Sequence, residues 1–336
     1  MSDASSNRWG WYFWIGSLLA LATLATSIVS IPNDREERRK NGMTMDWLGA
    51  ATTVSGLVLV VFAITESAHA EHRWRTPYIP VLFSVGCLLL MLAIYVEGWV
   101  ASMPLLPRDI FAVKAMVPLT VSVWLLIGTV GIFLLYGTQY LENIMGASPL
   151  QVVAWYVPMV LGGLILSTVE GFILHLVPGR ILLIISGLGA IGAQLLLALV
   201  PIGGNYWAWI FPAMVLGTVG IDLSYNLMAV FITTQLPRAH QGLAGGLINS
   251  VLQLGVALIL GLADIVQTYT VEEAGLGKSY KNTFWFGVAL GTTSLVLMII
   301  WGNIPKAKSD LTADEKAELE REAASESGTA PKAWQR

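Results

Sequence analysis

Apolar runs of about twenty residues alternate with short polar segments from Trp11 to Asn303. An α-helix rises about 1.5 Å per residue, so a run of this length crosses the roughly 30 Å hydrocarbon core of a bilayer. About nine runs are long enough, and we expect membrane spans near residues 11–31, 47–65, 78–96, 117–137, 150–173, 181–200, 207–231, 244–266 and 283–303.

These runs predict helices rather than strands. In lipid every backbone N–H and C=O group must pair within the protein, which leaves helices and closed barrels as spanning structures. Barrel strands are shorter and alternate apolar with polar residues, whereas the runs here, such as 181–185 and 195–197, are apolar without alternation. The fold class is therefore all-α, a polytopic membrane helix bundle.

The composition agrees with a membrane protein and argues against nucleic-acid binding and thiolate metal sites. The chain of 336 residues is 55% hydrophobic and 12% charged, with a mean hydropathy of +0.67, whereas about a quarter of the residues in soluble domains are charged. The net charge of -3 provides no basic stripe for a nucleic-acid backbone. The single cysteine, Cys87, offers neither a disulfide nor a thiolate metal cluster within one chain.

The distribution of basic residues predicts the orientation, because Lys and Arg near span ends favour the cytosolic side. One set of alternate loops carries most of them: Arg35, Arg38, Arg39, Lys40, Arg108, Lys114, Arg180, Arg238, Lys306 and Lys308. The other set carries fewer: Arg8, Arg73, Arg75, Lys278 and Lys281. We therefore expect the N-terminus outside and the C-terminus in the cytosol.

Two motifs resemble cofactor or metal sites, but we interpret the first as part of a membrane helix and the second as a solvated loop. Gly187, Gly189 and Gly192 have the G-x-G-x-x-G spacing of a dinucleotide-binding turn, yet the apolar run continues through them, so we interpret them as helix-packing glycines. An expected outer loop holds two acids and two histidines: Glu66, His69, Glu71 and His72. Their spacing does not gather all four on one metal. We expect no metal, no cofactor and no enzyme active site.

Ionisable residues inside the spans carry the most functional information, because a charge at the bilayer centre costs about 3 kcal/mol or more. Asp222 lies well inside the seventh run, with Tyr225 and Asn226 at helical spacings of three and four. Its carboxyl group suits proton uptake and release, and the alternative is a structural aspartate bonded to a neighbouring helix. Glu170 is a second proton-coupling candidate, near the cytosolic end of the fifth run, where its side chain can reach the interface.

The eighth run adds two amides. Asn249 and Gln253 are one helical turn apart and can point together into a polar interior. With Tyr225 and Asn226 they are the substrate-cavity candidates, although such amide pairs also bridge neighbouring helices.

The eighth run also contains Gly242 and Gly246 at the small-xxx-small spacing of packed membrane helices. Two further acids, Glu97 and Asp264, lie at the ends of runs, and we expect them at the membrane interface.

Several segments resemble one transporter family. They are residues 7–15 (NRWGWYFWI), 45–50 (MDWLGA), 103–107 (MPLLP), 171–180 and 236–255, the last beginning LPRAHQG. Here the chain resembles fungal members of the major facilitator superfamily, specifically the fourteen-helix drug:proton antiporter branch related to aminotriazole-resistance proteins.

The resemblance implies a fold equivalent to the last helix of the N-terminal half, two linker helices and the full C-terminal half of a major facilitator. It therefore predicts a chain truncated at the N-terminus. The implied segments are an N-terminal helix with a basic cytosolic loop (1–46), two linker helices (47–114), a six-helix C-terminal transporter bundle (115–305) and a cytosolic tail (306–336).

The resemblance also implies a function, the export of small organic molecules such as drugs, toxins or secondary metabolites by proton antiport, which the truncation would impair. The alternative is a non-transporting membrane protein that associates with, or regulates, a full-length transporter. The expected partners are the substrate, protons and the lipid bilayer, together with an N-terminal half-transporter or a second copy of the chain, and no nucleic acid. We expect a multi-pass protein of the plasma membrane, with the vacuolar membrane as the alternative.

Overall fold

The structure, a computed structural model, describes residues 8–30, 46–100, 116–173, 176–235 and 241–302. Among these residues, nine helices are long and apolar enough to cross a membrane, which confirms the expected all-α membrane fold. The chain divides into two units, Met1–Asp46 and Trp47–Arg336, which are described separately. The expected boundaries at 114 and 305 and the expected tail fall outside the described residues.

The first unit contains helix α1 (Arg8–Ser30). Its large apolar side chains are exposed all around the helix. Its hydroxyl groups bond to its own backbone, because Ser17, Thr23 and Thr26 each donate to the carbonyl four residues earlier at 2.7–3.0 Å. The helix therefore presents an apolar surface and satisfies its polar groups internally, as lipid requires.

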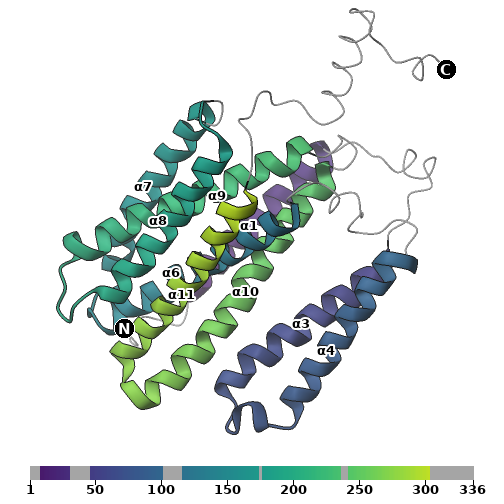
Figure 1. Ribbon diagram of the computed structural model, residues 1–336, viewed down its shortest axis with the longest axis horizontal. Helices are drawn as coiled ribbons and strands as arrows, with labels where there is room; N and C mark the ends of the chain where they lie inside the picture. Colours follow the sequence, from purple (N-terminus) through teal and green to yellow (C-terminus); the bar gives the residue numbers. More distant parts are fainter. Residues whose placement is uncertain (1–7, 31–45, 101–115, 174–175, 236–240, 303–336) are drawn as a thin grey trace, which may run out of the picture. The chain divides into compact units, whose positions relative to one another are not determined.

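The second unit begins with a hairpin of two long helices, α3 (Trp47–His69) and α4 (Tyr78–Tyr95), which lie side by side in Figure 1. The short helix η1 (Arg73–Arg75) connects them, and a π-helical turn, η2 (Val96–Val100), continues α4. A Cβ added at Gly86 would lie 2.8 Å from the Val60 side chain. Glycine therefore allows the two backbones to approach closely.

In the described remainder of the unit, six further long helices follow, which can be traced in Figure 1. They are α6 (Met116–Asn143), α7 (Pro149–Ile173), α8 (Gly179–Leu199), α9 (Phe211–Gln235), α10 (Gln241–Ala274) and α11 (Leu276–Trp301), with a π-helical turn, η3 (Tyr206–Ile210), before α9. Helix α6 packs against α9, α10 and α11, and 61% of its span is buried, compared with 6% of the α7 span. Helix α6 is thus central and α7 peripheral.

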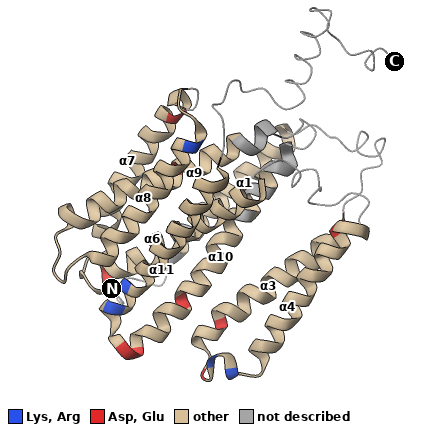
Figure 2. Ribbon diagram, in the orientation of Figure 1, with Lys and Arg blue, Asp and Glu red and all other residues tan. Residues whose placement is uncertain are grey.

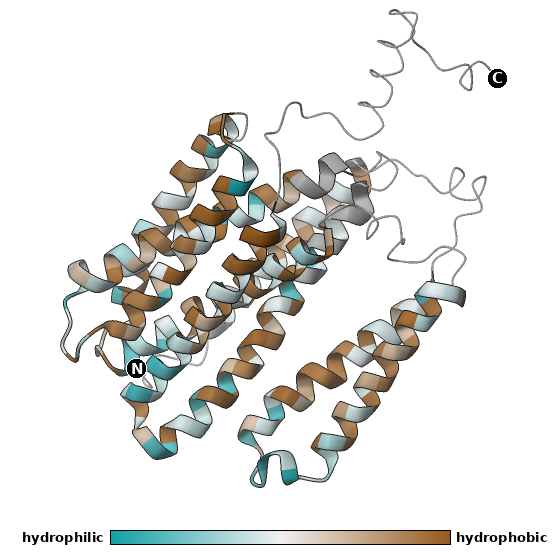
Figure 3. Cartoon of the chain, in the orientation of Figure 1, coloured by the Kyte–Doolittle hydropathy of each residue, from teal (hydrophilic) through white to brown (hydrophobic). Residues whose placement is uncertain are grey.

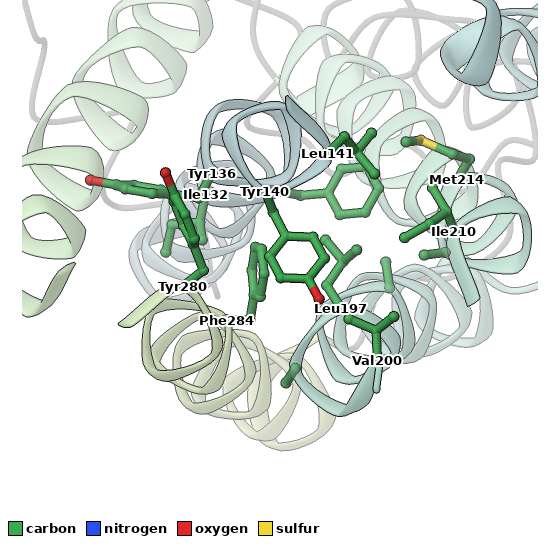
Figure 4. Packing of buried hydrophobic residues seen from close by; sticks show 14 of the residues in the cluster. Ile132, Tyr136, Tyr140, Leu141, Leu197, Val200, Ile210, Met214, Tyr280 and Phe284 are labelled. Carbon is green, nitrogen blue, oxygen red and sulfur yellow. The ribbon is translucent and has the colours of Figure 1, made fainter. Parts of the chain in front are cut away.

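Apolar residues cover these helices along their length, as Figure 3 shows. The outward-facing ones suit lipid, and the inward-facing ones interlock around tyrosines. In Figure 4 the ring of Tyr140 lies between Phe284 and Leu197. Its ring centroid is 5.9 Å from that of Phe284 and 6.1 Å from that of Tyr280, both edge to face, an arrangement that aromatic pairs favour. This cluster joins α6, α8 and α11.

Polar side chains inside the bundle bond to backbone carbonyls of neighbouring helices. Ser186 donates to Gly220 at 2.8 Å, Gln194 to Thr129 at 2.7 Å, and Ser294 to Ser122 at 2.7 Å. Such bonds between membrane helices contribute about 0.6–2 kcal/mol each. They link α8 to α9, α8 to α6, and α11 to α6, so they also help to fix which helices are neighbours.

The hairpin packs against the bundle through α10. A Cβ added at Gly261 would lie 3.0 Å from Cγ2 and 3.8 Å from Cβ of Ile64 in α3. Nearer the end of α3, Nδ1 of His69 lies 3.3 Å from Oδ2 of Asp264, and the Tyr136 hydroxyl donates to Oδ1 of Asp264 at 3.4 Å. Residues of α3, α6 and α10 therefore meet at Asp264.

One detail of the sequence analysis was wrong. Lys278 and Lys281, expected in a loop, lie in the first turns of α11, because that helix begins at Leu276. Asp264, expected at the interface, lies ten residues before the end of α10, which ends at Ala274, and its position at the membrane interface stays a prediction. In both cases the helix extends beyond the apolar run into residues with polar side chains.

The close packing of α8 on α9 predicts that a larger side chain at their contact destabilises the protein. A Cβ at Gly220 would lie 2.8 Å from the backbone nitrogen of Ala190, so Gly220→Ala must push the two helices apart. We expect the free energy of unfolding in detergent micelles to fall by about 1–3 kcal/mol. Gly245→Ala is the matched control, because no described atom lies within 4 Å of its added Cβ. Equal stability of the two variants would contradict this packing.

The contact between α3 and α10 predicts a cross-link. The 3.8 Å separation of the Ile64 Cβ and an added Cβ at Gly261 matches the usual Cβ separation of about 3.8 Å in disulfides. In a Cys87→Ala background, Ile64→Cys with Gly261→Cys should oxidise to a disulfide, which a mobility shift on reducing and non-reducing gels would detect. Ile64→Cys with Gly245→Cys is the control pair and should stay reduced. Equal cross-linking of both pairs would argue against the docked hairpin.

Candidate functional site

Helices α7 and α9 are separated by α8 in the sequence, lie in contact, and run in the same direction. Three side chains bond to α7 from α9 or from the η3 turn before it: the Tyr206 hydroxyl of η3 donates to the Trp155 carbonyl at 2.9 Å, Thr218 donates to the Met159 carbonyl at 3.3 Å, and Asn226 donates to Glu170. We call Tyr206, Thr218, Asp222, Asn226 and Glu170 the α7–α9 seam. Polar groups thus follow this contact through most of the two spans.

Glu170 is the most buried member of the seam. Its exposed fraction is 3%, so its side chain lies between the helices and does not reach the interface, contrary to the sequence-based expectation. The Asn226 amide donates to its Oε2, and Oε1 has no hydrogen-bond partner among the described residues. A buried carboxyl oxygen without a donor is costly, and a bound proton would reduce that cost.

Asp222 lies one helical turn before Asn226 and is half-buried. Its Oδ2 lies 3.0 Å from the position that a Cβ of Gly163 would occupy, so glycine in α7 leaves room for the carboxyl group. In the described part of the chain, no ion pair involves Asp222 or Glu170. Most charged positions lie towards helix ends (Figure 2), so acids without a cation inside the spans are exceptional.

The geometry suits reversible proton binding. Two carboxyl groups and one amide lie on adjacent turns of two parallel helices, away from lysine and arginine side chains of the described residues. Each acid can be neutralised by one proton, and the Asn226 amide can donate to the charged form of Glu170. Movement of α7 against α9 would change the contact between Glu170 and its donor Asn226, which connects proton binding to helix position.

The substrate-cavity candidates are dispersed, apart from Asn226. Tyr225 is 40% exposed and makes no hydrogen bond to the seam, because it lies around the helix from Asn226. Asn249 is exposed and its amide donates to the Gly245 carbonyl of its own helix at 3.2 Å. Gln253 is also exposed. The structure therefore does not gather the four residues, and their contact with substrate stays a prediction.

The glycines lie within helices. Gly187, Gly189 and Gly192 are in the interior of α8 with no turn between them. An added Cβ at Gly189 would lie 2.8 Å from the Leu216 carbonyl oxygen of α9, and one at Gly187 would lie 2.9 Å from Leu295. Gly246 has no described atom within 4 Å of an added Cβ, and Gly242 lies where side-chain surroundings are not described.

Sequence reasoning missed one cluster. His69 was assigned to a loop with Glu66, Glu71 and His72, but Glu66 and His69 are in α3, and Glu66 accepts a hydrogen bond from Tyr78 at 2.9 Å. The described residues contain no group of three or more His, Cys, Asp or Glu that could hold a metal ion. His69 instead contacts Asp264 of α10. The available signal was the apolar Ile-Val pair after Asp264, which indicates that the helix continues beyond it.

Comparison with known proteins identifies the family of this chain. The family model described as Major Facilitator Superfamily matches residues 2–260. The protein named efflux pump terG of Aspergillus terreus is 30% identical over 87% of this chain and 57% of its own length. The aminotriazole resistance protein of Saccharomyces cerevisiae is 27% identical over 87% of this chain and 53% of its own length.

The low affinity ammonium transporter of Saccharomyces cerevisiae is also 27% identical, over 90% of this chain and 60% of its own length. The chain thus spans between 53% and 60% of these curated relatives. The resemblance to the fungal drug-efflux branch is confirmed by the names of the efflux pump and the aminotriazole resistance protein.

The bond between Asn226 and Glu170 predicts a stability difference. Asn226→Ala removes the donor to a buried carboxyl group, and we expect the free energy of unfolding to fall by about 1–3 kcal/mol. Asn249→Ala is the control, because that amide is exposed and its bond among the described residues is to a carbonyl of its own helix. Detergent-titrated unfolding followed by circular dichroism would measure both. A loss no larger for Asn226→Ala than for Asn249→Ala would contradict the bond.

Proposed function

Because this chain belongs to the major facilitator superfamily, we propose that it takes part in the export of small organic molecules across a membrane by proton antiport. The family match and the relatives' names support membrane transport. The α7–α9 seam, with buried acids that lack a cation in the described part of the chain, is the observation that supports proton coupling. The protein is an integral, multi-pass membrane protein.

The proposed mechanism is alternating access, in which helix bundles rock about a site near the membrane midplane. In this mechanism Asp222 binds the coupling proton, because it lies in the middle part of α9 and is only half-buried. Glu170 binds a proton closer to the end of α7, where its charged form is held by Asn226. Protonation of either acid removes a charge from the seam and changes the preferred packing of α7 on α9.

Small residues of α7 face the seam residues of α9. Gly162 and Gly163 of α7 lie against Thr218 and Asp222 of α9, and each added Cβ would approach a side-chain atom at 3.0–3.3 Å. Close approach without bulky side chains lets the helices slide with little steric cost. The carboxyl group of Asp222 then stays near α7 in both the protonated and the charged form.

The names of the relatives indicate a broad class of substrate. Their names include an efflux pump, an aminotriazole resistance protein and a low affinity ammonium transporter. We propose organic molecules over ammonium because two of these three names refer to efflux or aminotriazole resistance. Tyr225, Asn226, Asn249 and Gln253 stay the candidates for substrate contact.

Replacing Asp222 tests the coupling. Membrane vesicles that contain the protein together with the N-terminal half of a full-length relative should exchange an organic dye for protons when a pH gradient is imposed, and Asp222→Asn should abolish this exchange because the amide cannot bind the proton. Dye fluorescence and internal pH would be followed together. Glu273→Gln is the control, since Glu273 is an exposed acid near the end of α10. Full coupled exchange in Asp222→Asn would remove the role of Asp222.

Infrared spectroscopy tests proton binding without a substrate. On a change of pH, the carbonyl stretch of a protonated carboxyl group should appear in wild-type protein and weaken in Asp222→Asn and in Glu170→Gln. The control Glu273→Gln should leave this band unchanged. An identical band in all four proteins would show that neither seam acid exchanges a proton.

A further inference from the structure

An open cleft of about 460 Å³ lies beside the connection between α3 and α4. Five of its lining residues belong to that connection and one to α10: Glu71, His72, Arg73, Trp74, Arg75 and Tyr269. Its volume is in the range of small-molecule sites, about 300–1,000 Å³. None of these residues belongs to the α7–α9 seam, so the cleft is separate from the proposed proton site.

Arg73 is held rigidly at one side of the cleft. Its guanidinium group lies 2.7 Å from Oε2 of Glu272 and 4.0 Å from the ring centroid of Tyr269. The hydrogen bond to Glu272 raises the pKa of Arg73 above its ordinary value, so the group stays charged. The backbone of Arg73 has φ = 52°, a left-handed conformation that is uncommon for residues other than glycine. Such backbone strain is frequent where a ligand is held.

The other groups of the cleft combine opposite charges with aromatic rings. The Arg75 and Glu71 side chains make no hydrogen bond or ion pair with any described residue, and both residues are exposed. The ring of Trp74 is fixed by an edge-to-face contact with Phe83, with centroids 5.5 Å apart. The cleft therefore offers one available guanidinium, one available carboxylate and the ordered ring of Trp74, whereas one face of the Tyr269 ring is already covered by Arg73.

We propose that this cleft binds the headgroup of a zwitterionic phospholipid. Arg75 binds the phosphate, because a guanidinium donates two parallel hydrogen bonds to phosphate oxygens. The headgroup ammonium lies against the ring of Trp74 and close to Glu71, since cations bind the faces of aromatic rings. The cleft lies where two spanning helices are joined, and the ends of membrane spans are where aromatic and basic side chains meet lipid headgroups.

The balance of charge favours a zwitterion over a simple anion. The charge of Arg73 is already paired with Glu272, so Arg75 and Glu71 contribute one charge of each sign. An anionic lipid would leave Glu71 without a cation and would bring a second negative charge near it. Phosphatidylcholine should therefore bind more tightly than phosphatidylglycerol with the same acyl chains.

Lipid retention on the purified full chain tests this site. The protein in a maltoside detergent would be incubated with short-chain phosphatidylcholine or phosphatidylglycerol, and bound lipid would be counted by native mass spectrometry. We expect wild-type protein to prefer phosphatidylcholine, and Arg75→Ala to weaken its binding about tenfold, as for loss of a hydrogen bond to a charged group. Glu71→Gln should abolish the preference, because phosphatidylglycerol is then no longer repelled.

Lys278→Ala is the matched control, because Lys278 is an exposed cation of α11 near the same end of α10 and does not line the cleft. It should bind phosphatidylcholine as the wild type does. Thermal unfolding of each variant would show that Arg75→Ala is folded, and Arg75→Lys, which keeps the charge, should bind at an intermediate level. Equal retention of the two lipids by wild-type protein would overturn the proposal. Binding of inorganic phosphate with the same dependence on Arg75, and without a lipid preference, would also overturn it.

Discussion

The absence of hydrogen-bond partners in lipid is the constraint on which this structure depends. It makes every described span a helix, because only then do the backbone groups of a single segment pair with one another. The same constraint sends the hydroxyls of α1 back to their own carbonyls and the buried amide of Gln194 to a carbonyl of α6. A polar side chain inside this bundle is therefore expected to have a hydrogen-bond partner or a functional role.

Lipid is as apolar as the side chains of the helices, so helix association relies on close contact and interhelical bonds. Gly189 and Gly220 allow α8 and α9 to touch through their backbones. The α7–α9 contact satisfies the same requirement with Gly162 and Gly163 but places carboxyl groups beside them. An intimate helix contact and a candidate proton site are thus the same feature, which is why helix movement and proton binding can be linked.

The two ends of the second unit differ in the chemistry that they present. At one end, Glu170 is buried between helices with a single amide donor. At the other, His69, Asp264, Arg73 and Glu272 join the α3–α4 hairpin to α10 by polar contacts near water. Exposed ion pairs of this kind contribute little to stability. Their importance is in positioning the hairpin loop, and with it the cleft around Arg75.

The sequence by itself determined the number and approximate position of the spans. The length and hydropathy of a segment are local properties, and they decide whether that segment is stable in the hydrocarbon core of a bilayer. It also identified Asp222 and Asn226 as members of one helix face, since helical spacing is local too. Only the tertiary structure decided that Glu170 is buried against Asn226, that Tyr225 and Asn249 are apart from them, and that His69 meets Asp264. The periodicity of a helix defines its faces, but which helix lies against each face depends on packing between segments far apart in the chain.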